Sequence, residues 1–518
     1  MSGEWDTSIL PKVHPSVVHM LDEAAARSGA GTALVYGDRR LSYAQYLRCV
    51  AGFARELVGL GARGSRVALV CANSLDLPIA MFAAHAAGAQ AVPINPAYTA
   101  RELGHILGDA EPAVVVYDAE VSATVEPLGS SLGIPHAIRV GGSGGRGLDA
   151  WQDEASLCLP EPLPGPGDLA TLQYTGGTTG LPKGVNITHG QMAVNISQRE
   201  AALPTRTADE RILCVMPLFH VFAVAMCLHL AAYCRGTLVI VRRYRPEVVL
   251  DLVVRERITR LPAGPTVFIG LLNHEQFGQA DFASLRTAYS GSAPLPEETL
   301  KRWQEATGAP ILEGFGQTEA GPVLTYVREG ATIKPGSVGP ALPLTELQVV
   351  DVETGTRALG PGQLGEIRAR GPQLMSDYRN RPRETAEALR DGWLYTGDLG
   401  EFDAGGYVYI RDRKKDMAIV GGYNVYPREV DEVLFAHPAV KEAAAAGVPD
   451  PYYGETIRAY VVLKDGARAT VEELLAHCRA NLARYKVPSK LYVVAELPRT
   501  TVGKIDRKVL RGKLAAEG

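Results

Sequence analysis

Short apolar runs alternate with helical patterns early in the chain, and this alternation limits the possible fold more than any other feature. Residues 66–71, 90–94 and 113–117 have the composition of buried strands, and residues 77–87 and 99–107 have helical patterns. Parallel strands need a crossover connection, and a helix usually supplies it. We therefore expect βαβ units and a largely parallel sheet.

The remaining regions differ in character. Residues 141–167 are rich in Gly and Pro and predict surface loops, and a second alternating region runs from 213 to 312. Residues 336–406 hold short strands separated by Gly and Pro, which predicts a small β-rich unit. A charge cluster at 411–416 then precedes a final stretch of alternating helices and strands.

The final stretch reads as a compact α+β domain. We expect helices at 427–436 and 471–482, and strands at 443–448, 456–463 and 490–494. The 518 residues thus predict an α/β protein, with a large multi-subdomain N-terminal domain of βαβ sheets and a small β-rich unit, and a small α+β C-terminal domain.

Composition excludes some classes of protein. There are 53 Lys and Arg against 57 Asp and Glu, a net charge of −4, which argues against a general nucleic-acid binder. Residues 212–234 lack any charged side chain for 23 residues. Because they contain Pro217, His220 and His229 and have globular flanks, we expect a buried helix and strand rather than a transmembrane segment.

The cysteines and the N-terminus both indicate a cytoplasmic location. The 7 cysteines are odd in number and form no Cys-x-x-Cys pair, which is typical of reduced thiols. The first fourteen residues lack the basic start and apolar core of a signal peptide.

Lysine is unevenly distributed, and this singles out one loop. Of 13 lysines, nine lie at or after residue 414, so Lys183 is one of four in the preceding 413 residues. It belongs to Tyr174-Thr-Gly-Gly-Thr-Thr-Gly-Leu-Pro-Lys-Gly184. Glycines that expose backbone amides, threonine hydroxyls and one ammonium suit phosphate oxygens. The spacing differs from the Walker pattern.

This loop resembles the phosphate-binding loop of the adenylate-forming superfamily, which includes acyl-CoA synthetases, peptide-synthetase adenylation domains and luciferases. Further motifs of that superfamily follow in order, and the resemblance covers essentially the whole chain. It is most similar to the medium- and long-chain fatty acid–CoA ligases. The resemblance implies that the ATP phosphates are bound by Thr175, Gly176, Gly177, Thr178, Thr179, Gly180 and Lys183.

Two more motifs are similar to nucleotide-binding motifs of the family. In Gly314-Phe-Gly-Gln-Thr-Glu319 the resemblance implies that Glu319 holds Mg²⁺, Thr318 donates to the α-phosphate and Phe315 faces adenine. Asp398, in Tyr-Thr-Gly-Asp, and Arg413 are expected on the ribose hydroxyls. The other expected nucleotide contacts are Ser292, Ala293, Pro294, Gly314, Gly316 and Ile410.

The C-terminal residues resemble the part of these enzymes that moves. Lys415 falls on the hinge position, and Gly421, Gly422 and Tyr423 fall where relatives pass the pantetheine arm of CoA. Lys504 matches the catalytic lysine, which would bridge the attacking carboxylate and the α-phosphate. A protein acetyltransferase acting on Lys504 is an expected partner, and acetylation would abolish adenylation by removing the charge.

The acyl site is expected around Met216-Pro-Leu-Phe-His-Val-Phe222, where His220 would form a wall and guide thioester formation. The segments 220–228, 264–272 and 290–295 contain no charged residue, which disfavours dicarboxylic acids. Gln317 adds a polar group, so aryl or oxygenated acids stay open. The expected pocket residues are His220, Phe222, Gly264, Thr266, Gly291 and Gln317.

Together these motifs predict an ATP-dependent acid–CoA ligase. Residues 1–412 would bind ATP, Mg²⁺ and a carboxylic acid, most simply a fatty acid, and residues 413–518 would form a mobile domain. The enzyme would make acyl-AMP and then acyl-CoA, and release pyrophosphate and AMP. Three alternatives stay open: an aryl acid–CoA ligase, an acyl-AMP ligase that loads a carrier protein in trans, and a nucleotide-binding sensor without chemistry. A homodimer is also open.

Overall fold

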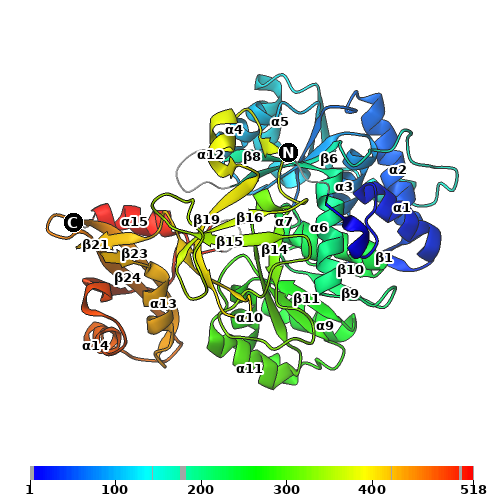
Figure 1. Cartoon of the computed structure of the whole chain (residues 1–518). Coiled ribbons are helices and arrows are strands. Elements are labelled where there is room, and N and C mark those ends of the chain that lie inside the picture. Colours follow the sequence, from blue (N-terminus) through cyan, green and yellow to red (C-terminus); the bar gives the residue numbers. More distant parts are fainter. Residues whose placement is uncertain (1–4, 143, 176–181, 422, 501–503, 517–518) are drawn as a thin grey trace.

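The computed structural model describes residues 5–142, 144–175, 182–421, 423–500 and 504–516. Strands among these residues form four sheets, of eight, seven, five and five strands. Three sheets lie in a large body, and the fourth lies in a small C-terminal unit beside it (Figure 1). The predicted α/β architecture is confirmed.

The seven-stranded sheet has the order β17-β8-β7-β4-β3-β5-β6. Its strands β4, β3, β5 and β6 are parallel, as the early βαβ rhythm predicts, whereas β7 and β8 form an antiparallel hairpin. Its strands are β3 (Arg66–Val70), β4 (Gln90–Ile94), β5 (Val114–Asp118), β6 (His136–Val140), β7 (Leu169–Thr175), β8 (Lys183–Thr188) and β17 (Asp377–Tyr378).

The eight-stranded sheet has the order β14-β13-β12-β11-β9-β10-β1-β2. Its six inner strands are parallel, and the edge strands β2 and β14 are antiparallel to their neighbours. Its strands are β1 (Thr32–Tyr36), β2 (Arg39–Ser42), β9 (Arg211–Cys214), β10 (Thr237–Ile240), β11 (Arg260–Ala263), β12 (Thr287–Ser290), β13 (Ile311–Gly316) and β14 (Val323–Tyr326).

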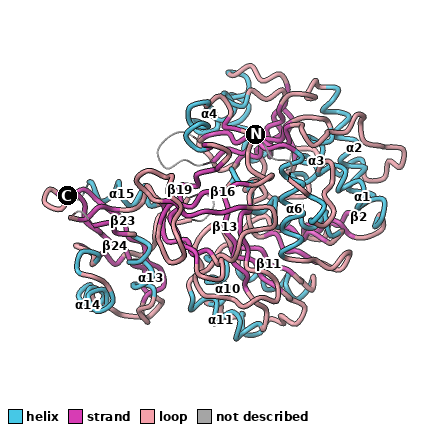
Figure 2. The backbone as a smooth tube through the Cα atoms, in the orientation of Figure 1, coloured by secondary structure: helices cyan, strands magenta, loops and turns pink. Residues whose placement is uncertain are grey.

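Helices cover these two sheets and fill the space between them (Figure 2). Every residue of α3 is buried, as expected of a helix that is apolar on all sides. Helix α6 contacts β7 and β8 of one sheet and β14 of the other. The α-helices of the body are α1 (Val17–Ser28), α2 (Tyr43–Gly59), α3 (Asp76–Ala86), α4 (Ala100–Ala110), α5 (Ser122–Ser131), α6 (His189–Ala202), α7 (Val221–Ala223), α8 (Leu230–Cys234), α9 (Pro246–Arg255), α10 (Pro265–Leu272), α11 (Glu297–Thr307) and α12 (Pro382–Ala388).

Several helices begin at capping boxes. At α4, the Thr99 hydroxyl accepts from the backbone N–H of Glu102, and the Glu102 carboxylate accepts from the backbone N–H of Thr99. These two bonds fix the first turn. The shorter helical turns are η1 (Thr7–Ile9), η2 (Ala119–Val121), η3 (Leu148–Trp151), η4 (Val224–His229), η5 (Phe277–Gln279), η6 (Thr318–Ala320) and η7 (Arg484–Lys486).

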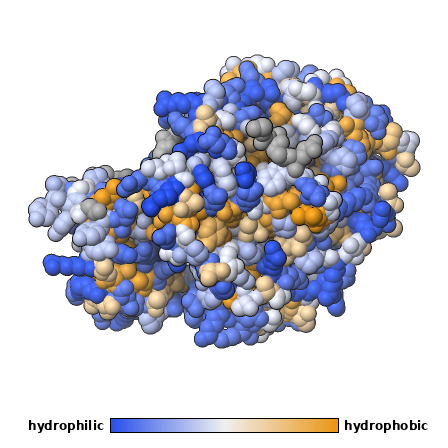
Figure 3. Space-filling view, viewed as in Figure 1, coloured by the Kyte–Doolittle hydropathy of each residue, from blue (hydrophilic) through white to orange (hydrophobic). Residues whose placement is uncertain are grey.

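The long uncharged segment is a strand followed by helices, as predicted. Its elements are β9, α7, η4 and α8, and η4 is a π-helix whose residues are all buried. Among the described residues, every helix is too short or too polar to cross a bilayer. Hydrophilic residues cover much of the face in Figure 3, with hydrophobic residues gathered across its middle.

The third sheet of the body is the β-rich unit that the sequence predicts. Its order is β15-β16-β19-β18, and β20 pairs with β19; all pairings are antiparallel. Its strands are β15 (Glu346–Val350), β16 (Gly365–Arg370), β18 (Leu389–Arg390), β19 (Trp393–Phe402) and β20 (Val408–Arg413).

The small C-terminal unit is α+β, as expected. Its sheet has the order β22-β21-β24-β23, with β25 parallel to β24. Its elements are β21 (Ala418–Val420), β22 (Tyr423–Val425), α13 (Pro427–Phe435), β23 (Val440–Asp450), β24 (Gly454–Leu463), α14 (Val471–Asn481), β25 (Lys490–Val493) and α15 (Arg507–Ala516).

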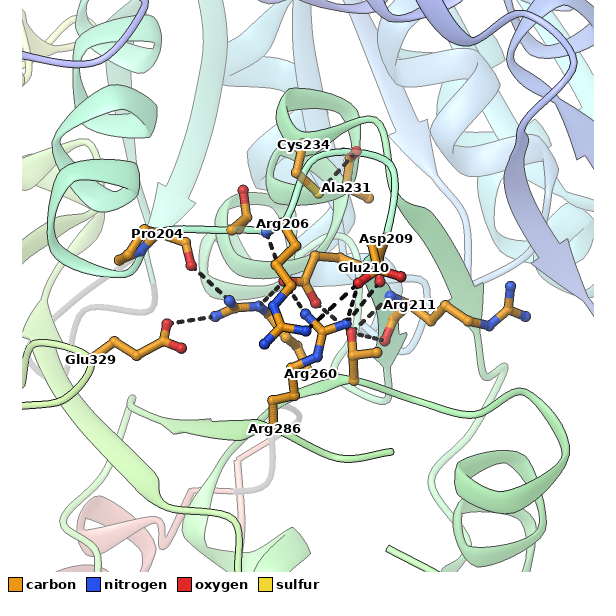
Figure 4. A network of polar contacts seen from close by, with 12 residues as sticks. Pro204, Arg206, Asp209, Glu210, Arg211, Ala231, Cys234, Arg260, Arg286 and Glu329 are labelled. Atoms are coloured by element: carbon orange, nitrogen blue, oxygen red, sulfur yellow. Dashed lines mark hydrogen bonds and ion pairs between the residues drawn. The ribbon is translucent and has the colours of Figure 1, made fainter. Parts of the chain in front are cut away.

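A buried cluster of ion pairs lies at the amino ends of three parallel strands (Figure 4). Glu210 precedes β9, Arg260 begins β11, and Arg286 precedes β12. The Arg260 Nε lies 2.9 Å from Glu210, and the Arg286 Nη1 lies 3.3 Å from it. Arg260 also lies 3.3 Å from Glu329. Each buried charge here therefore has an opposite charge beside it.

Candidate active site

The phosphate-binding loop is expected in the β7–β8 hairpin, and the structure describes both of its ends. Thr175 and Lys183 face each other across the antiparallel pair, and the Thr175 hydroxyl donates to the Lys183 carbonyl at 3.4 Å. The Tyr174 hydroxyl anchors the hairpin by donating to Asp109 at 2.6 Å. The expected loop residues Gly176, Gly177, Thr178, Thr179 and Gly180 lie outside the described residues.

A tyrosine joins the expected lysine and carboxylate of the phosphate site. The Lys183 Nζ lies 4.3 Å from the ring centroid of Tyr378, and the Tyr378 hydroxyl donates to Glu319 Oε1 at 2.8 Å. Burial, reinforced by the Glu319 charge, raises the pKa of Tyr378, so this phenol stays protonated and keeps donating. Tyr378 thereby contacts both Lys183 and Glu319, which are 136 positions apart in the sequence.

Glycines in the Gly314–Glu319 segment allow β13 to lie tightly against β14. A Cβ on Gly314 would overlap the ring of Tyr326, and a Cβ on Gly316 would overlap the Pro322 carbonyl. Phe315 is half-buried, and its N–H donates to the Thr325 hydroxyl at 3.2 Å. Thr318 and Glu319 of η6, which follow β13 directly, therefore lie at the carboxyl end of the sheet.

The loop after β12 is strained where it approaches the expected adenine site. Ser292 has φ of +70°, which is rare for a residue with a side chain and is found at functional sites. Ala293 and Pro294 are exposed. The loop is held by Glu313, which accepts from the N–H of Leu295 at 3.3 Å, and burial raises the pKa of Glu313 to about 7.

Asp398 and Arg413, both expected on the ribose hydroxyls, form an ion pair with each other. The Arg413 Nε lies 2.7 Å from Asp398 Oδ1, whereas Oδ2 is buried without a hydrogen-bond partner among the described residues. Burial raises the pKa of Asp398, and the positive charge of Arg413 partly opposes this rise. A buried, unsatisfied carboxylate oxygen is costly, so Oδ2 fits a hydroxyl that arrives with a ligand. Ile410 lies on the adjacent strand β20, where its carbonyl accepts from Arg428.

Lys504 reaches this site from the small unit. Its backbone carbonyl accepts from the N–H of Thr500 at 2.7 Å. Burial, followed by the charge of Arg413, lowers the pKa of Lys504 to about 8, while Asp398 opposes the shift. The Lys504 charge in turn acts on His220, whose pKa is lowered to about 3, chiefly by burial. His220 is therefore neutral, and its Nδ1 accepts from the N–H of Phe222 at 3.2 Å.

The contacts of Gly421 and Tyr423, the described residues of the expected CoA segment, lie within the small unit. The N–H of Gly421 donates to the Tyr453 carbonyl at 2.9 Å. Tyr423 is 59% exposed and stacks on Tyr485, with ring centroids 4.7 Å apart. Lys415 is exposed between β20 and β21, and Gly422 lies outside the described residues. The charge of Lys504 thus acts on Arg413 and Asp398, whereas the ring contact of Tyr423 lies within the small unit.

The expected acyl-pocket residues are only partly gathered. The Phe222 ring packs directly against Gly291, and Gly264 lies near both Gly291 and Met216. Gln317 is half-buried beside Thr318, whereas Thr266 is exposed on α10. Phe222 therefore fills the space in front of Gly291 in this conformation.

Sequence reasoning missed Tyr378 and Glu313. Neither residue type is diagnostic of a phosphate or adenine site, and Tyr378 follows the Gly314–Glu319 motif by about 60 positions. Only the pairing of β17 with β8 brings the tyrosine beside Lys183.

Comparison with known proteins agrees with this geometry. The model of the AMP-binding enzyme family matches residues 21–379, and the model of the AMP-binding enzyme C-terminal domain matches residues 429–504. The chain belongs to the AMP-binding enzyme family. This enzyme is 36% identical to the long-chain-fatty-acid–CoA ligase of Bacillus subtilis, over 97% of this chain and 95% of the relative.

The names of two further similar proteins refer to aromatic acids. A feruloyl-CoA synthase of Amycolatopsis is 38% identical over 93% of this chain and 95% of the relative. The crystal structure of the anthranilate CoA ligase AuaEII with anthranoyl-AMP superimposes with a TM-score of 0.92 and 29% identity, over 99% of this chain and all (100%) of that one. The AMP-binding enzyme described here is an AMP-forming acid–CoA ligase that works through an acyl-adenylate, with ATP and CoA as cosubstrates.

Proposed function

We propose that this AMP-binding enzyme activates a hydrophobic carboxylic acid, most simply a fatty acid, and transfers it to CoA. One observation supports the assignment of roles most strongly: Lys504 of the small unit lies beside Asp398 and His220 of the large body. The fatty-acid ligase of Bacillus subtilis supports the substrate class.

In the first half-reaction, a carboxylate oxygen of the acid bonds to the α-phosphorus of ATP as the bond to pyrophosphate breaks. Lys183 and Thr175, which face each other across the β7–β8 hairpin, would bind the outer phosphates, and Thr318 would donate to the α-phosphate. Lys504 would neutralise charge that grows on the attacking carboxylate and the α-phosphate. Asp398 and Arg413 would hold the ribose.

Glu319 fits a magnesium ion that arrives with ATP. Its Oε1 accepts from Tyr378, and Oε2 has no hydrogen-bond partner among the described residues. Within the same residues no group of three or more His, Cys, Asp or Glu could hold a metal ion. Mg²⁺ commonly takes one or two carboxylates and otherwise phosphate oxygens and water, so one glutamate suffices. When bound, the ion would neutralise phosphate charge.

In the second half-reaction, the CoA thiolate attacks the acyl carbonyl carbon and AMP leaves. The small unit would rotate about Lys415, withdraw Lys504 and bring Gly421, Gly422 and Tyr423 over the site. The exposed position of Tyr423 supports this, because a segment that later contacts the substrate has to be free to move. In this proposal residues 1–412 form the fixed part and residues 413–518 the moving part.

An aryl acid is the second candidate substrate. Gln317 is half-buried beside Thr318 and offers a polar group to an oxygenated ring, and the feruloyl-CoA synthase is 38% identical. A cytoplasmic location is part of the proposal, since ATP and CoA are found there and all seven cysteines are free. Each chain forms its own site, so a homodimer would hold two. A protein acetyltransferase that modified Lys504 would switch off the first half-reaction.

The experiment is a pyrophosphate-release screen with fatty acids of increasing length and with aryl acids, each with and without CoA. We expect pyrophosphate in both conditions and sustained AMP release only with CoA. AMP release that needs a carrier protein instead of CoA would favour the acyl-AMP ligase, and no pyrophosphate with any acid would refute the proposal.

A further inference from the structure

The segment that leads to His220 has no regular secondary structure of its own. Strand β9 ends at Cys214 and α7 begins at Val221, and the residues between them belong to no helix or strand. Met216 and Leu218 of this segment are buried. Because buried backbone N–H and C=O groups need hydrogen-bond partners, the partners of this segment have to come from other parts of the fold.

Asn73, three residues after β3, supplies partners for the first part of the segment. It is buried, its Nδ2 donates to the Met216 carbonyl at 3.0 Å, and its Oδ1 accepts from the N–H of Leu218 at 2.7 Å. Its Nδ2 also donates to the carbonyl of Val241, directly after β10, at 3.0 Å. Asn73 therefore joins the carboxyl ends of strands from both large sheets.

Gln173 supplies the partner next to His220 itself. It is buried on β7, two residues before Thr175 of the expected phosphate loop. Its Nε2 donates to the Phe219 carbonyl at 3.0 Å. That carbonyl belongs to the planar peptide bond between Phe219 and His220. The Gln173 amide therefore fixes the peptide group from which His220 starts.

The pattern of β7 explains why Gln173 faces this segment. Its neighbours Leu172 and Tyr174 pack in an apolar cluster that includes Leu103 and Ile106 of α4. Because successive side chains of a strand point to opposite faces of the sheet, Gln173 points away from α4. A buried polar side chain on that face needs a partner, and the Phe219 carbonyl provides it.

The surroundings of His220 connect Gln173 to the reacting groups. The Nδ1 atom of His220 accepts from the N–H of Phe222 at 3.2 Å, so the imidazole caps the start of α7. Gln173, Val221 and Thr318 line one small cavity of about 30 Å³. Gln173 therefore lies where the strand of the phosphate hairpin meets the acyl segment.

We propose that Gln173 is a positioning residue that acts through His220: by holding the Phe219 carbonyl, it keeps the imidazole at the wall of the acyl site. This inference rests on the proposed function, in which His220 forms that wall and guides thioester formation. Gln173 itself would touch neither the acid nor CoA. Without its N–H donor, the buried Phe219 carbonyl would be unsatisfied, which favours a shifted backbone and a displaced histidine.

The test uses Gln173→Met, which keeps the length of the side chain and removes the donor. The substrate is the best acid of the pyrophosphate-release screen. We expect KM for the acid to rise about five- to tenfold, while KM for ATP stays within about twofold, because the change acts at the acyl site. Thioester formation from supplied acyl-adenylate and CoA should slow by a similar factor.

Gln90→Met is the matched control. Gln90 is a buried glutamine of the same sheet, and its Nε2 donates to Asn186 Oδ1 at 2.8 Å. It begins β4, which is parallel to β7, so it lies at the opposite end of the sheet from Thr175. This variant removes one buried hydrogen bond as Gln173→Met does, and it should leave KM for the acid unchanged.

A double-mutant cycle tests whether Gln173 acts through the histidine. In the His220→Ala background, Gln173→Met should change KM for the acid by less than about twofold, because the positioned group is already absent.

Gln173→Glu gives a second readout. A protonated carboxyl group can donate to the Phe219 carbonyl, and an ionised one cannot. Because burial raises the pKa of a carboxyl group, we expect KM for the acid, as a ratio to that of the parent, to fall as the pH is lowered from about 8 to about 6.

Several results would overturn the inference. They are an unchanged KM for the acid in Gln173→Met, an equal rise in KM for acid and for ATP, the same rise in Gln90→Met, and an undiminished effect of Gln173→Met in the His220→Ala background. A ratio for Gln173→Glu that stays high at every pH would do the same. In each case pyrophosphate release persists, so the ligase assignment survives. No pyrophosphate release by the parent enzyme with any acid would instead refute the proposed function.

Discussion

The two ends of the eight-stranded sheet differ in whether their buried charged groups have partners. At the amino ends of β9, β11 and β12, Glu210 has two arginines beside it, at 2.9 Å and 3.3 Å. At the carboxyl ends lie His220, the strained Ser292 and Thr318, and Asp398 approaches with one unsatisfied oxygen. Ligands of open parallel sheets bind at the carboxyl ends.

We infer that the paired charges stabilise the fold and that the incompletely paired ones bind a ligand. Where every charge is paired, the pairing stabilises the folded chain and needs nothing else. Where a carboxylate oxygen or an ammonium is buried without its full set of partners, the missing partner is expected to come with substrate. Substitutions at the amino end should therefore change stability, and substitutions at the carboxyl end should change activity.

The largest effect is expected at the amino end. Glu210→Gln would leave Arg260 and Arg286 without their shared carboxylate, and we expect the free energy of unfolding to fall by about 3–5 kcal/mol. Denaturant unfolding measures this. Asp209→Asn is the matched control: Asp209 lies 2.8 Å from the same Arg286 but is 64% exposed, so its loss should cost less than about 1 kcal/mol. Equal effects of both changes would contradict the paired-cluster account.

Lys504→Ala should give the largest effect on activity. Loss of an ammonium aimed at charge that develops in the transition state is expected to slow adenylation by about 100- to 1,000-fold. Initial rates of pyrophosphate release measure it. Lys508→Ala is the control, because Lys508 is exposed and four residues away. Thermal unfolding of the Lys504 variant should match the parent, and a large loss of stability would place Lys504 among the structural charges instead.

A smaller effect is expected at the ribose residue. Asp398→Asn keeps the shape but removes the charge that pairs with Arg413, and we expect KM for ATP to rise about 10- to 100-fold, since a hydrogen bond to a charged group contributes about 1.5–3 kcal/mol. Asp351→Asn, a change in an exposed turn, should leave KM unaltered. An unchanged KM in Asp398→Asn would remove Asp398 from the nucleotide site.

The smallest effect is a pH dependence. The pKa of Lys504 is lowered to about 8 by burial, so the free enzyme loses this proton above that pH. Because adenylation needs the charged form, kcat/KM for ATP should fall as pH rises above about 8. In Lys504→Arg the guanidinium stays charged, and the alkaline decline should disappear. A decline that persists in this variant would assign the titration to another group.

The sequence predicts the motifs better than it predicts their neighbours. The hairpin at Lys183, the Gly314–Glu319 segment and Asp398 could be identified because each is a contiguous pattern, and the early βαβ rhythm follows from local periodicity. Tyr378 and the Glu210–Arg260 pair could not. Each of them acts through a partner at least 50 positions away, and only the packing of sheets and helices brings the partners together.

We propose that Lys504 serves the first half-reaction alone, because its charge acts on Asp398 and His220, whereas Tyr423 is exposed and stacks on Tyr485 of the small unit. The most direct test supplies purified acyl-adenylate and CoA to Lys504→Ala and measures acyl-CoA formation next to adenylation from acid and ATP. We predict that thioester formation stays within about fivefold of the parent while adenylation falls about 100-fold or more. An equal loss in both half-reactions would contradict the account.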